Sequence, residues 1–411
     1  MISSVAYIAM HTSPLIQPGI GNAGGMNVYL DRLSRTMAAS NVDVTVFTRR
    51  SESESDTVTE VMPGYRVVQI ETGPAERISL TEMRLYAAEF AREVEKWIRS
   101  HGRTYDLVHS HYWLSGRCGV RLKDALGIPL ANSFHTLGKV KDATRGTDEP
   151  LSSSHRLLTE QEVIERSDCV IASTPYEFDD LLEHYGASPE RLCVSPPGVD
   201  HSVFSPGSRS DAKTKLGFGD ERIILFAGRI QSHKGTDLAV RSFGKIPAIL
   251  ADDTGPTTLH IIGGASGPDG EAELARCHIS AERLGVADRI RYFEPVPHSS
   301  LADHYRASEV VIVPSRSESF GLVAAEAQAC GIPVVAANAG GLPYVINASE
   351  SGLLVDDHDP QAFASAIAAI LEHGSFAERL GQGGVAYSQK FSWHTTTMRL
   401  LELYEGITSQ P

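Results

Sequence analysis

The sequence predicts an α/β protein of two domains, each built on a doubly wound parallel sheet. Three observations lead to this fold class. The 411 residues exceed what one hydrophobic core usually supports. Short apolar runs alternate with amphipathic helical stretches, which is typical of βαβ units. The alternation lapses over 195–211, where Pro and Gly crowd together, and then starts again. We therefore expect one domain over 1–198 and a second over 199–385.

Apolar runs of strand length recur through both predicted domains. In the first domain they cover 4–10, 43–50, 65–72, 106–111, 129–136, 169–174 and 191–198, with helical periodicity at 26–40 and 79–102. The second of these helices begins with a capping box from Ser79 to Glu82. In the second domain the expected strands are 222–230, 257–264, 289–296, 310–315, 333–338 and 352–357, and the expected helices are 235–250, 272–285 and 322–331.

Composition and charge exclude several classes of function. The net charge is -14, with no basic stripe that would bind nucleic acid or an anionic membrane. No run reaches the ~18 apolar residues of a membrane span, and the N-terminus lacks the basic region of a signal peptide, so we expect a cytoplasmic protein. Cys169, Cys193 and Cys330 lie in apolar runs, and we expect reduced, buried thiols.

Two carboxylates in "SRSESFGLVAAEAQACG" predict a nucleotide-sugar site. Glu318 follows the strand 310–315, and Glu326 lies two turns into the next helix. The backbone N–H groups of Ser319, Phe320, Gly321 and Leu322 would be free donors at a helix N-terminus, where a diphosphate binds well. A carboxylate is an acceptor only, so the pair suits the hydroxyls of a ribose and a hexose. The alternative is a solvated helix residue and a partner of the helix dipole.

Further polar residues follow other predicted strands. Arg229 and Lys234 in "FAGRIQSHKG" would neutralise the charge that develops on a diphosphate leaving group. Gly24 and Gly25 open a helix after a Gly/Pro-rich loop, which allows close approach to a phosphate or sugar.

A third group of residues points to the acceptor. His135 lies at the end of the strand 129–136 and is interpreted either as a core histidine or as a hydrogen-bonding group near the sugar. Tyr112 and Thr136 supply neutral donors, and Arg156 supplies a cationic fork for an anion. No G-x-S-x-G elbow, Walker lysine loop or HExxH motif is present. A two-lobed binding protein and a sugar epimerase remain as alternatives.

These motifs resemble the retaining glycosyltransferases of family 4. "ESFGLVAAE", "GRIQSHKG" and "AGGLP" are similar to the signatures of that family, and "HTSPLIQPGIGNAGGMNVY" and "HSHYWLSG" are similar to its branch that glycosylates inositol phosphate in actinobacterial mycothiol synthesis. The resemblance implies a GT-B fold of two Rossmann-like domains facing across a cleft, with the segment 386–411 crossing back to the first domain. It also implies a UDP-GlcNAc-like donor, a small soluble acceptor, no cofactor or catalytic metal, no stable membrane association and an enzyme that often forms homodimers.

The resemblance also implies roles for individual residues. His135, Arg229, Lys234 and Glu318 would be catalytic. Donor-binding residues would be Gln17, Pro18, Gly25, Arg229, Lys234, Val296, Glu318, Ser319, Phe320, Gly321, Leu322 and Glu326. Acceptor-binding residues would be His11, Asn22, Gly24, Met26, Asn27, Leu80, Tyr112, Thr136 and Arg156.

One residue departs from the pattern of this branch. Its relatives carry a phosphate-binding lysine where this sequence has Leu80. The acceptor therefore remains open between inositol phosphate and an unphosphorylated cyclitol, aminocyclitol or small thiol of specialised metabolism. UDP and GDP donors remain equally open.

Overall fold

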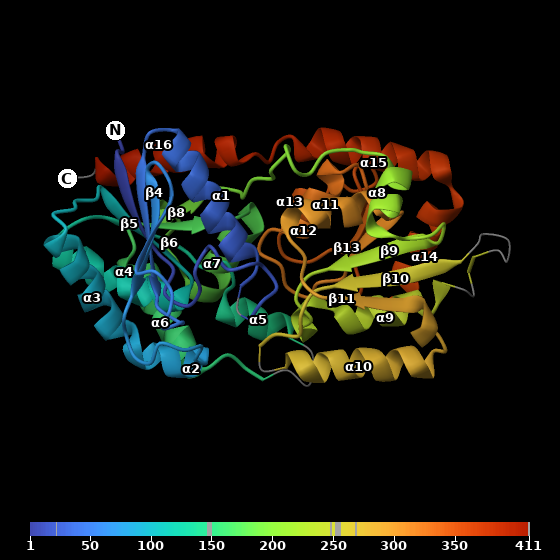
Figure 1. Cartoon of the computed structure of the whole chain (residues 1–411), viewed down its shortest axis with the longest axis horizontal. Coiled ribbons are helices and arrows are strands. Elements are labelled where there is room, and N and C mark those ends of the chain that lie inside the picture. The colour runs from blue at the N-terminus through green and yellow to red at the C-terminus, as the bar shows by residue number, and fades with distance from the viewer. Residues whose placement is uncertain (22, 146–149, 247–248, 251–255, 268, 410–411) are drawn as a thin grey trace.

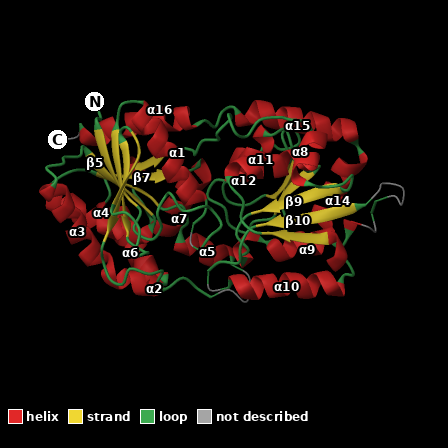
Figure 2. Ribbon diagram, viewed as in Figure 1, coloured by secondary structure: helices red, strands yellow, loops and turns green. Residues whose placement is uncertain are grey.

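The computed structural model describes residues 1–411 apart from 22, 146–149, 247–248, 251–255, 268 and 410–411. It shows two α/β halves next to each other along the long axis of the molecule (Figure 1). Each half has its own sheet with helices packed against it (Figure 2). The predicted fold class is confirmed, whereas the domain boundaries at 198 and 385 stay a prediction.

The N-terminal half is built on an eight-stranded sheet that is parallel except for its edge strand β3, which pairs antiparallel with β4. The strands are β1 (Ser4–Ile8), β2 (Asp43–Arg49), β3 (Val58–Met62), β4 (Tyr65–Ile70), β5 (Leu107–His111), β6 (Leu130–Ser133), β7 (Cys169–Ala172) and β8 (Leu192–Val194), in the order β3-β4-β2-β1-β5-β6-β7-β8. Strands such as β5 to β7 are buried along their whole length because helices cover both faces of the sheet.

Helices connect these parallel strands. They are α1 (Gly25–Ala39), α2 (Leu80–Met83), η1 (Arg84–Tyr86), α3 (Ala87–Ser100), α4 (Trp113–Leu126), α5 (Gly138–Thr144), α6 (Ser154–Arg166), α7 (Pro175–Tyr185) and η2 (Pro189–Arg191). Local sequence sets their ends. For example, Thr174 caps α7 by accepting from the N–H of Glu177, Pro175 takes the first helical position, and Gly186 ends the helix in the left-handed region.

The C-terminal half is built on a six-stranded, fully parallel sheet. Its strands are β9 (Arg222–Ala227), β10 (Thr257–Ile262), β11 (Ile290–Phe293), β12 (Val310–Val313), β13 (Val334–Ala337) and β14 (Leu353–Val355), in the order β11-β10-β9-β12-β13-β14. Its helices are α8 (Arg209–Leu216), η3 (Ser232–Lys234), α9 (Thr236–Phe243), α10 (Gly270–Arg283), η5 (Ala287–Arg289), α11 (His298–Ala307), α12 (Leu322–Ala329), α13 (Leu342–Val345), α14 (Pro360–Glu372) and α15 (Gly374–Ser388).

The last helix, α16 (Trp393–Thr408), returns to the N-terminal half and packs on α1 (Figure 1). The chain thus passes between the halves twice, and the two passages lie side by side. Val199 and Ser392 form a parallel bridge, and the N–H of Val199 donates to the carbonyl of Phe391 over 3.2 Å. A Cβ on Gly198 would lie 2.2 Å from the backbone nitrogen of Trp393, so only glycine fits where the passages meet.

Some elements differ from the sequence-based expectation. The helix expected over 79–102 begins at the predicted capping box but splits into α2, η1 and α3. At the break the ring of Tyr86 lies where a side chain on Gly73 would be, at 2.7 Å from its Cβ position. Of the helix expected over 235–250, α9 covers Thr236–Phe243 and a turn begins at Gly244, whereas residues 247–248 lie outside the described residues.

The cysteines also differ from expectation. The structure joins Cys169 and Cys193 in a disulfide, with their Cα atoms 6.4 Å apart. The prediction of reduced thiols is wrong for this pair, because β7 and β8 are neighbours in the sheet, which the sequence alone did not reveal. Cys330 is free and buried, as expected. No helix of the described residues is long and apolar enough to cross a membrane.

Candidate active site

Polar side chains collect at the carboxyl ends of both sheets. In the N-terminal sheet the strand order reverses between β1 and β5, and His11 and Tyr112 follow these two strands. In the C-terminal sheet it reverses between β9 and β12, which Arg229 and Glu318 follow. Such reversal points are where open α/β sheets bind ligands. The site therefore lies where the two halves meet.

Lys234 and Glu318 form an ion pair at this junction. The Nζ of Lys234 lies 2.7 Å from Oε2 of Glu318, to which the hydroxyl of Ser315 also donates over 3.3 Å. Two glycines contact the backbone of the turn that contains Glu318. The N–H of Gly341 donates to the Glu318 carbonyl over 2.7 Å, and a Cβ on Gly340, at φ +52°, would lie 2.1 Å from that oxygen. The glycine pair of "NAGGLP" thus positions Glu318.

The guanidinium of Arg229 lies at the same junction and has no carboxylate partner among the described residues. Among the described residues its guanidinium makes no hydrogen bond or ion pair, and a Cβ on Gly24 would lie 3.3 Å from its Nε. Burial lowers the pKa of Arg229, although the charges of Tyr112 and Glu318 act in the opposite direction. An unpaired, partly buried guanidinium is a strong site for an anion.

The N-terminus of α12 lies near Arg229, because Gly24 contacts Arg229 and the next residue, Gly25, contacts Leu322. Gly321, at φ +107°, precedes its first residue Leu322, and no side chain caps the helix. Gly25 approaches from the other half, since a Cβ on it would lie 3.4 Å from Cδ1 of Leu322. Phe320 is buried against Phe391, with ring centroids 5.2 Å apart. The first turn of α12 therefore offers free N–H donors and the positive end of a helix dipole.

Glu326 lies two turns further along α12 and is buried. The hydroxyl of Tyr305 donates to its Oε2 over 3.0 Å. Burial raises the pKa of Glu326 to about 8, against smaller opposing effects of Tyr305 and Arg32. Burial therefore favours the protonated form of the Glu326 carboxyl group, which can donate a hydrogen bond as well as accept one.

Ser319 connects the two halves. Its hydroxyl donates to the carbonyl oxygen of His135 over 2.6 Å, and its own carbonyl accepts from the hydroxyl of Thr174 over 3.3 Å. Gln17 makes a second such contact, from its Nε2 to the carbonyl of Pro295 over 2.7 Å. The side chain of Ser319 is therefore engaged across the junction, whereas the group expected at the donor is its backbone N–H.

Two histidines line the N-terminal side of the site as neutral groups. His135 has φ +60° and lies with its Nε2 3.0 Å from Nδ1 of His111. Burial lowers the pKa of His135 to about 3. Burial, reinforced by the charges of His135 and Arg229, likewise lowers the pKa of His11 to about 3. Neutral imidazoles suit hydrogen bonds to sugar hydroxyls.

Tyr112, Thr136 and Arg156 form a cluster, as the sequence predicts. The guanidinium carbon of Arg156 lies 5.4 Å from the ring centre of Tyr112, and its Nη2 donates to the carbonyl and hydroxyl oxygens of Thr136 over 2.9 and 3.2 Å. Its Nε donates over 2.7 Å to Glu160, which is fully buried. The sequence analysis missed Glu160, although its i,i+4 spacing from Arg156 was a usable signal.

Other predicted site residues have structural contacts. Asn27 is buried and its side chain ties the preceding loop together, donating to Thr12 and Ser13 and accepting from the N–H of Gly24. Met26 packs against the N-terminal core, Leu80 packs against the same half, and Val296 packs against the C-terminal core. Pro18 is half-buried. Asn22 lies outside the described residues.

A separate surface cavity of about 420 Å³ lies at the opposite, amino-terminal ends of the N-terminal strands. It is lined by Lys123, Glu165, Arg166, Asp168, Glu190 and Arg191. Lys123 pairs with Asp168 and Arg166 with Asp124, so these charges neutralise one another. The junction between the halves, with its unpaired cation, is the better candidate for chemistry.

Solved structures share this architecture. The chain superposes on a sucrose-phosphate synthase from Thermosynechococcus elongatus with a TM-score of 0.90 and 31% identity, over 98% of this chain and 99% of that one. It also superposes on Anabaena Alr3699/HepE in complex with UDP and glucose, with a TM-score of 0.77 over 98% and 100% of the two chains; at 17% identity this likeness shows the fold alone. The fold and the site together define a glycosyltransferase of the GT-B class.

Sequence relatives identify the family of glycosyltransferases to which the chain belongs. Residues 23–203 match the family described as Glycosyltransferase Family 4, and residues 208–386 match Glycosyl transferases group 1. The chain belongs to glycosyltransferase family 4. It is 42% identical to the D-inositol 3-phosphate glycosyltransferase of Kribbella flavida over 98% of this chain and 96% of that one. It is 39% identical to the enzyme of the same name from Corynebacterium efficiens, with the same coverage.

Proposed function

We propose that this glycosyltransferase transfers a GlcNAc-like hexosyl unit, with retention of configuration, from a nucleotide diphosphate sugar to a small acceptor in the cytoplasm. The observation that carries the proposal is the grouping of Arg229, Lys234 and Glu318 at the uncapped N-terminus of α12. A diphosphate there meets two cations and free N–H donors, while a carboxylate remains for the sugar. The relatives named D-inositol 3-phosphate glycosyltransferase support inositol phosphate as the acceptor.

The proposed donor roles follow the positions of the residues. Arg229 and Lys234 bind the diphosphate with the backbone of 319–322, and Gly25 allows close approach from the other half. Glu326 binds the ribose hydroxyls, and Glu318 binds hydroxyls of the transferred sugar. Gln17, Pro18 and Val296 lie around Pro295 at the base end of the donor.

The proposed acceptor residues lie on the N-terminal side of the site. Tyr112, Thr136 and Arg156 form its centre. His11 adds an imidazole whose buried Nδ1 has no hydrogen-bond partner among the described residues. Gly24, Met26 and Asn27 supply the wall formed by the start of α1.

The mechanism that fits these groups is front-face substitution. The acceptor hydroxyl attacks the anomeric carbon on the face from which the nucleotide diphosphate departs, and its proton passes to the leaving phosphate oxygen. Arg229, Lys234 and the dipole of α12 stabilise the negative charge on that leaving group, in place of a metal or cofactor. Neutral His135 lies beside the transferred sugar and orients it by hydrogen bonding.

A second candidate is transfer to an unphosphorylated cyclitol, aminocyclitol or small thiol, with UDP or GDP as carrier. Two observations favour it. Leu80 packs on apolar side chains where relatives are expected to place a lysine, and the charge of Arg156 is offset by buried Glu160. Losing one cation–phosphate contact costs about 1.5–3 kcal/mol.

Calorimetric binding of UDP and GDP tests the donor site. We expect the wild type to bind one of them, and Glu326→Ala to weaken that binding at least about tenfold through lost ribose contacts. The matched control is Glu282→Ala, on the exposed surface of α10. Failure of the wild type to bind either nucleotide, or unchanged affinity in Glu326→Ala, contradicts the proposal.

An acceptor screen then separates the two candidates. Purified protein is supplied with UDP-GlcNAc and either inositol 1-phosphate or free inositol, and the transferred sugar is measured with its anomeric configuration. Preference for the phosphorylated acceptor supports the first candidate, and preference for the free cyclitol supports the second. Inversion of the anomeric centre contradicts the retaining mechanism. Release of an epimerised free sugar indicates an epimerase.

A further inference from the structure

Lys234 and Glu318 belong to different loops, and the sheet does not hold these loops together. Lys234 ends η3 after β9, whereas Glu318 lies in the turn after β12. The pairing of β9 with β12 covers Ile224 with Val310 and Leu225 with Val311, and stops there. The spacing of the two charged side chains must therefore be set by contacts between the loops themselves.

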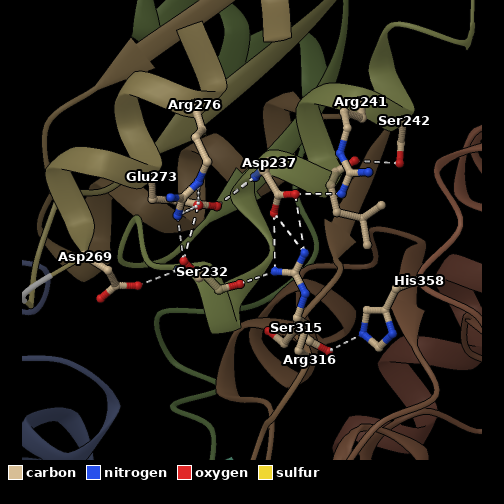
Figure 3. Close-up of polar contacts among 11 residues, drawn as sticks. Ser232, Asp237, Arg241, Ser242, Asp269, Glu273, Arg276, Ser315, Arg316 and His358 are labelled. Atoms are coloured by element: carbon tan, nitrogen blue, oxygen red, sulfur yellow. Dashed lines mark hydrogen bonds and ion pairs between the residues drawn. The ribbon is translucent and has the colours of Figure 1, made fainter. Parts of the chain in front are cut away.

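Arg316 makes these contacts (Figure 3). It lies two residues before Glu318, and its Nη1 donates to the carbonyl oxygen of Ser232. Its backbone N–H donates to the carbonyl oxygen of His233 over 2.8 Å. Arg316 is thus bonded to both residues that precede Lys234. It therefore connects the loop of Lys234 with the turn of Glu318.

Asp237 completes the connection from the start of α9. Both nitrogens of the Arg316 fork lie 3.3 Å from Oδ1 of Asp237. The side chains of Arg316 and Asp237 are 18% and 17% exposed, so solvent screens this pair less than a surface pair. Burial alone would raise the pKa of Asp237, but the charges of Arg316 and Arg241 outweigh burial and lower it.

Side chains of α10 also bind the loop that contains Lys234. Glu273, 1% exposed, accepts from the N–H of Asp237 over 3.1 Å and from the hydroxyl of Ser232 over 3.4 Å. Arg276 pairs with Glu273 and donates to the same hydroxyl over 2.8 Å (Figure 3). These contacts fix the loop to its own half, but none of them reaches the turn of Glu318. Apart from the Lys234–Glu318 pair itself, the side chain among the described residues that joins this fixed loop to that turn is Arg316.

We propose that Arg316 is a positioning residue for the donor site: paired with Asp237, it sets the spacing between Lys234 and Glu318 so that both meet the donor at once. This inference rests on the proposed function. Arg316 itself does not reach the ligand, because its guanidinium is occupied by Ser232 and Asp237. Its loss would let the two loops separate, and Lys234 would no longer be held over the diphosphate.

The test compares Arg316→Met with Arg241→Met. Arg241 is a matched control because it binds the same Asp237 over 2.6 Å but lies on α9, away from the turn of Glu318. Calorimetry measures UDP or GDP, whichever the wild type binds, and the corresponding monophosphate. We expect Arg316→Met to weaken diphosphate binding about tenfold and monophosphate binding much less, with both affinities unchanged in Arg241→Met.

A double variant separates positioning from general loss of structure. If Arg316 acts through Lys234, the variant Lys234→Met with Arg316→Met should bind the diphosphate no more weakly than Lys234→Met alone. Arg316→Lys, which keeps the charge but not the fork, gives an intermediate loss and serves where Arg316→Met unfolds. Wild-type affinity in both Arg316 variants overturns the inference and leaves the proposed function standing. A wild type that binds neither nucleotide overturns both.

Discussion

Glu326 is 5% exposed, and the hydrogen-bond partner of its carboxyl group among the described residues is the hydroxyl of Tyr305. Burial raises its pKa from the ordinary 4.5 to about 8. Between these values the folded protein holds a proton that the unfolded chain has released. The free energy of unfolding should therefore fall as pH rises through this window.

Replacing this group should remove its share of the pH dependence. We expect Glu326→Gln to be increasingly more stable than the wild type as pH rises from 5 to 8, because glutamine carries no charge to bury. Thermal unfolding midpoints at several pH values measure the difference, with each 1 kcal/mol shifting the midpoint by roughly 2–4 °C. Glu282→Gln, an exposed carboxyl, is the control. A difference that does not change with pH contradicts this interpretation.

At the level of residues, the sequence could predict which polar residues directly follow a strand. Arg229, Lys234 and Glu318 follow strands, and parallel strands bring such residues to one edge. The sequence could not show that Ser319 is engaged by His135, because their contact spans 184 residues. Nor could it show that the pKa of Glu326 is raised, since the cause is burial.

The helix α16 has a clear role as an element. It follows the second passage between the halves and inserts Trp393, Leu400, Tyr404 and Ile407 into the core of the N-terminal half. The hydroxyl of Tyr404 lies 2.6 Å from Nδ1 of His109 on β5. The C-terminal segment thus completes the core of the sheet that carries His135.

A pair of substitutions on this helix tests that role. Leu400→Ala removes a fully buried side chain and should lower the free energy of unfolding by about 2–5 kcal/mol. Met398→Ala, on the same helix but 46% exposed, should change it by less than about 0.5 kcal/mol. Urea unfolding followed by circular dichroism measures both. Equal effects would mean that α16 does not stabilise the core.

Most elements could be predicted because buried parallel strands are continuous apolar runs. All thirteen expected strands are present among the fourteen strands that the described residues form. The missing one, β3, is an antiparallel edge strand whose side chains are largely accessible to solvent, so its sequence has no apolar run. The break between α2 and α3 depends on a tertiary contact of Tyr86 with Gly73, which helical periodicity does not show.

On the scale of the whole molecule, few polar side-chain contacts join the two halves within the part of the chain that the structure describes. Ser319 bonds to His135 and Thr174, Gln17 bonds to the carbonyl of Pro295, and Arg32 of α1 pairs with Asp200 over 2.8 Å. Because the site uses residues of both halves, their relative placement decides whether it is complete.

Weakening this junction should open the molecule. Ser319→Ala removes the 2.6 Å hydrogen bond to His135, and a contribution of about 1 kcal/mol would raise the population of open arrangements about fivefold. Small-angle X-ray scattering should then give a larger radius of gyration. Ser315→Ala is the control, because Ser315 bonds to Glu318 within one half. Identical scattering from wild type and Ser319→Ala would show that this contact does not govern closure.

The paired passages at Val199 and Ser392 constrain how such opening can occur. A single connecting segment would let the two halves rotate freely about it. Two segments bonded to each other resist such twisting and leave mainly a bending motion of one half relative to the other. Substrates would then enter through a cleft that opens on the side away from the two passages and closes by that bending motion. Each closure would return the same atoms to the same places, which a reaction with two substrates requires.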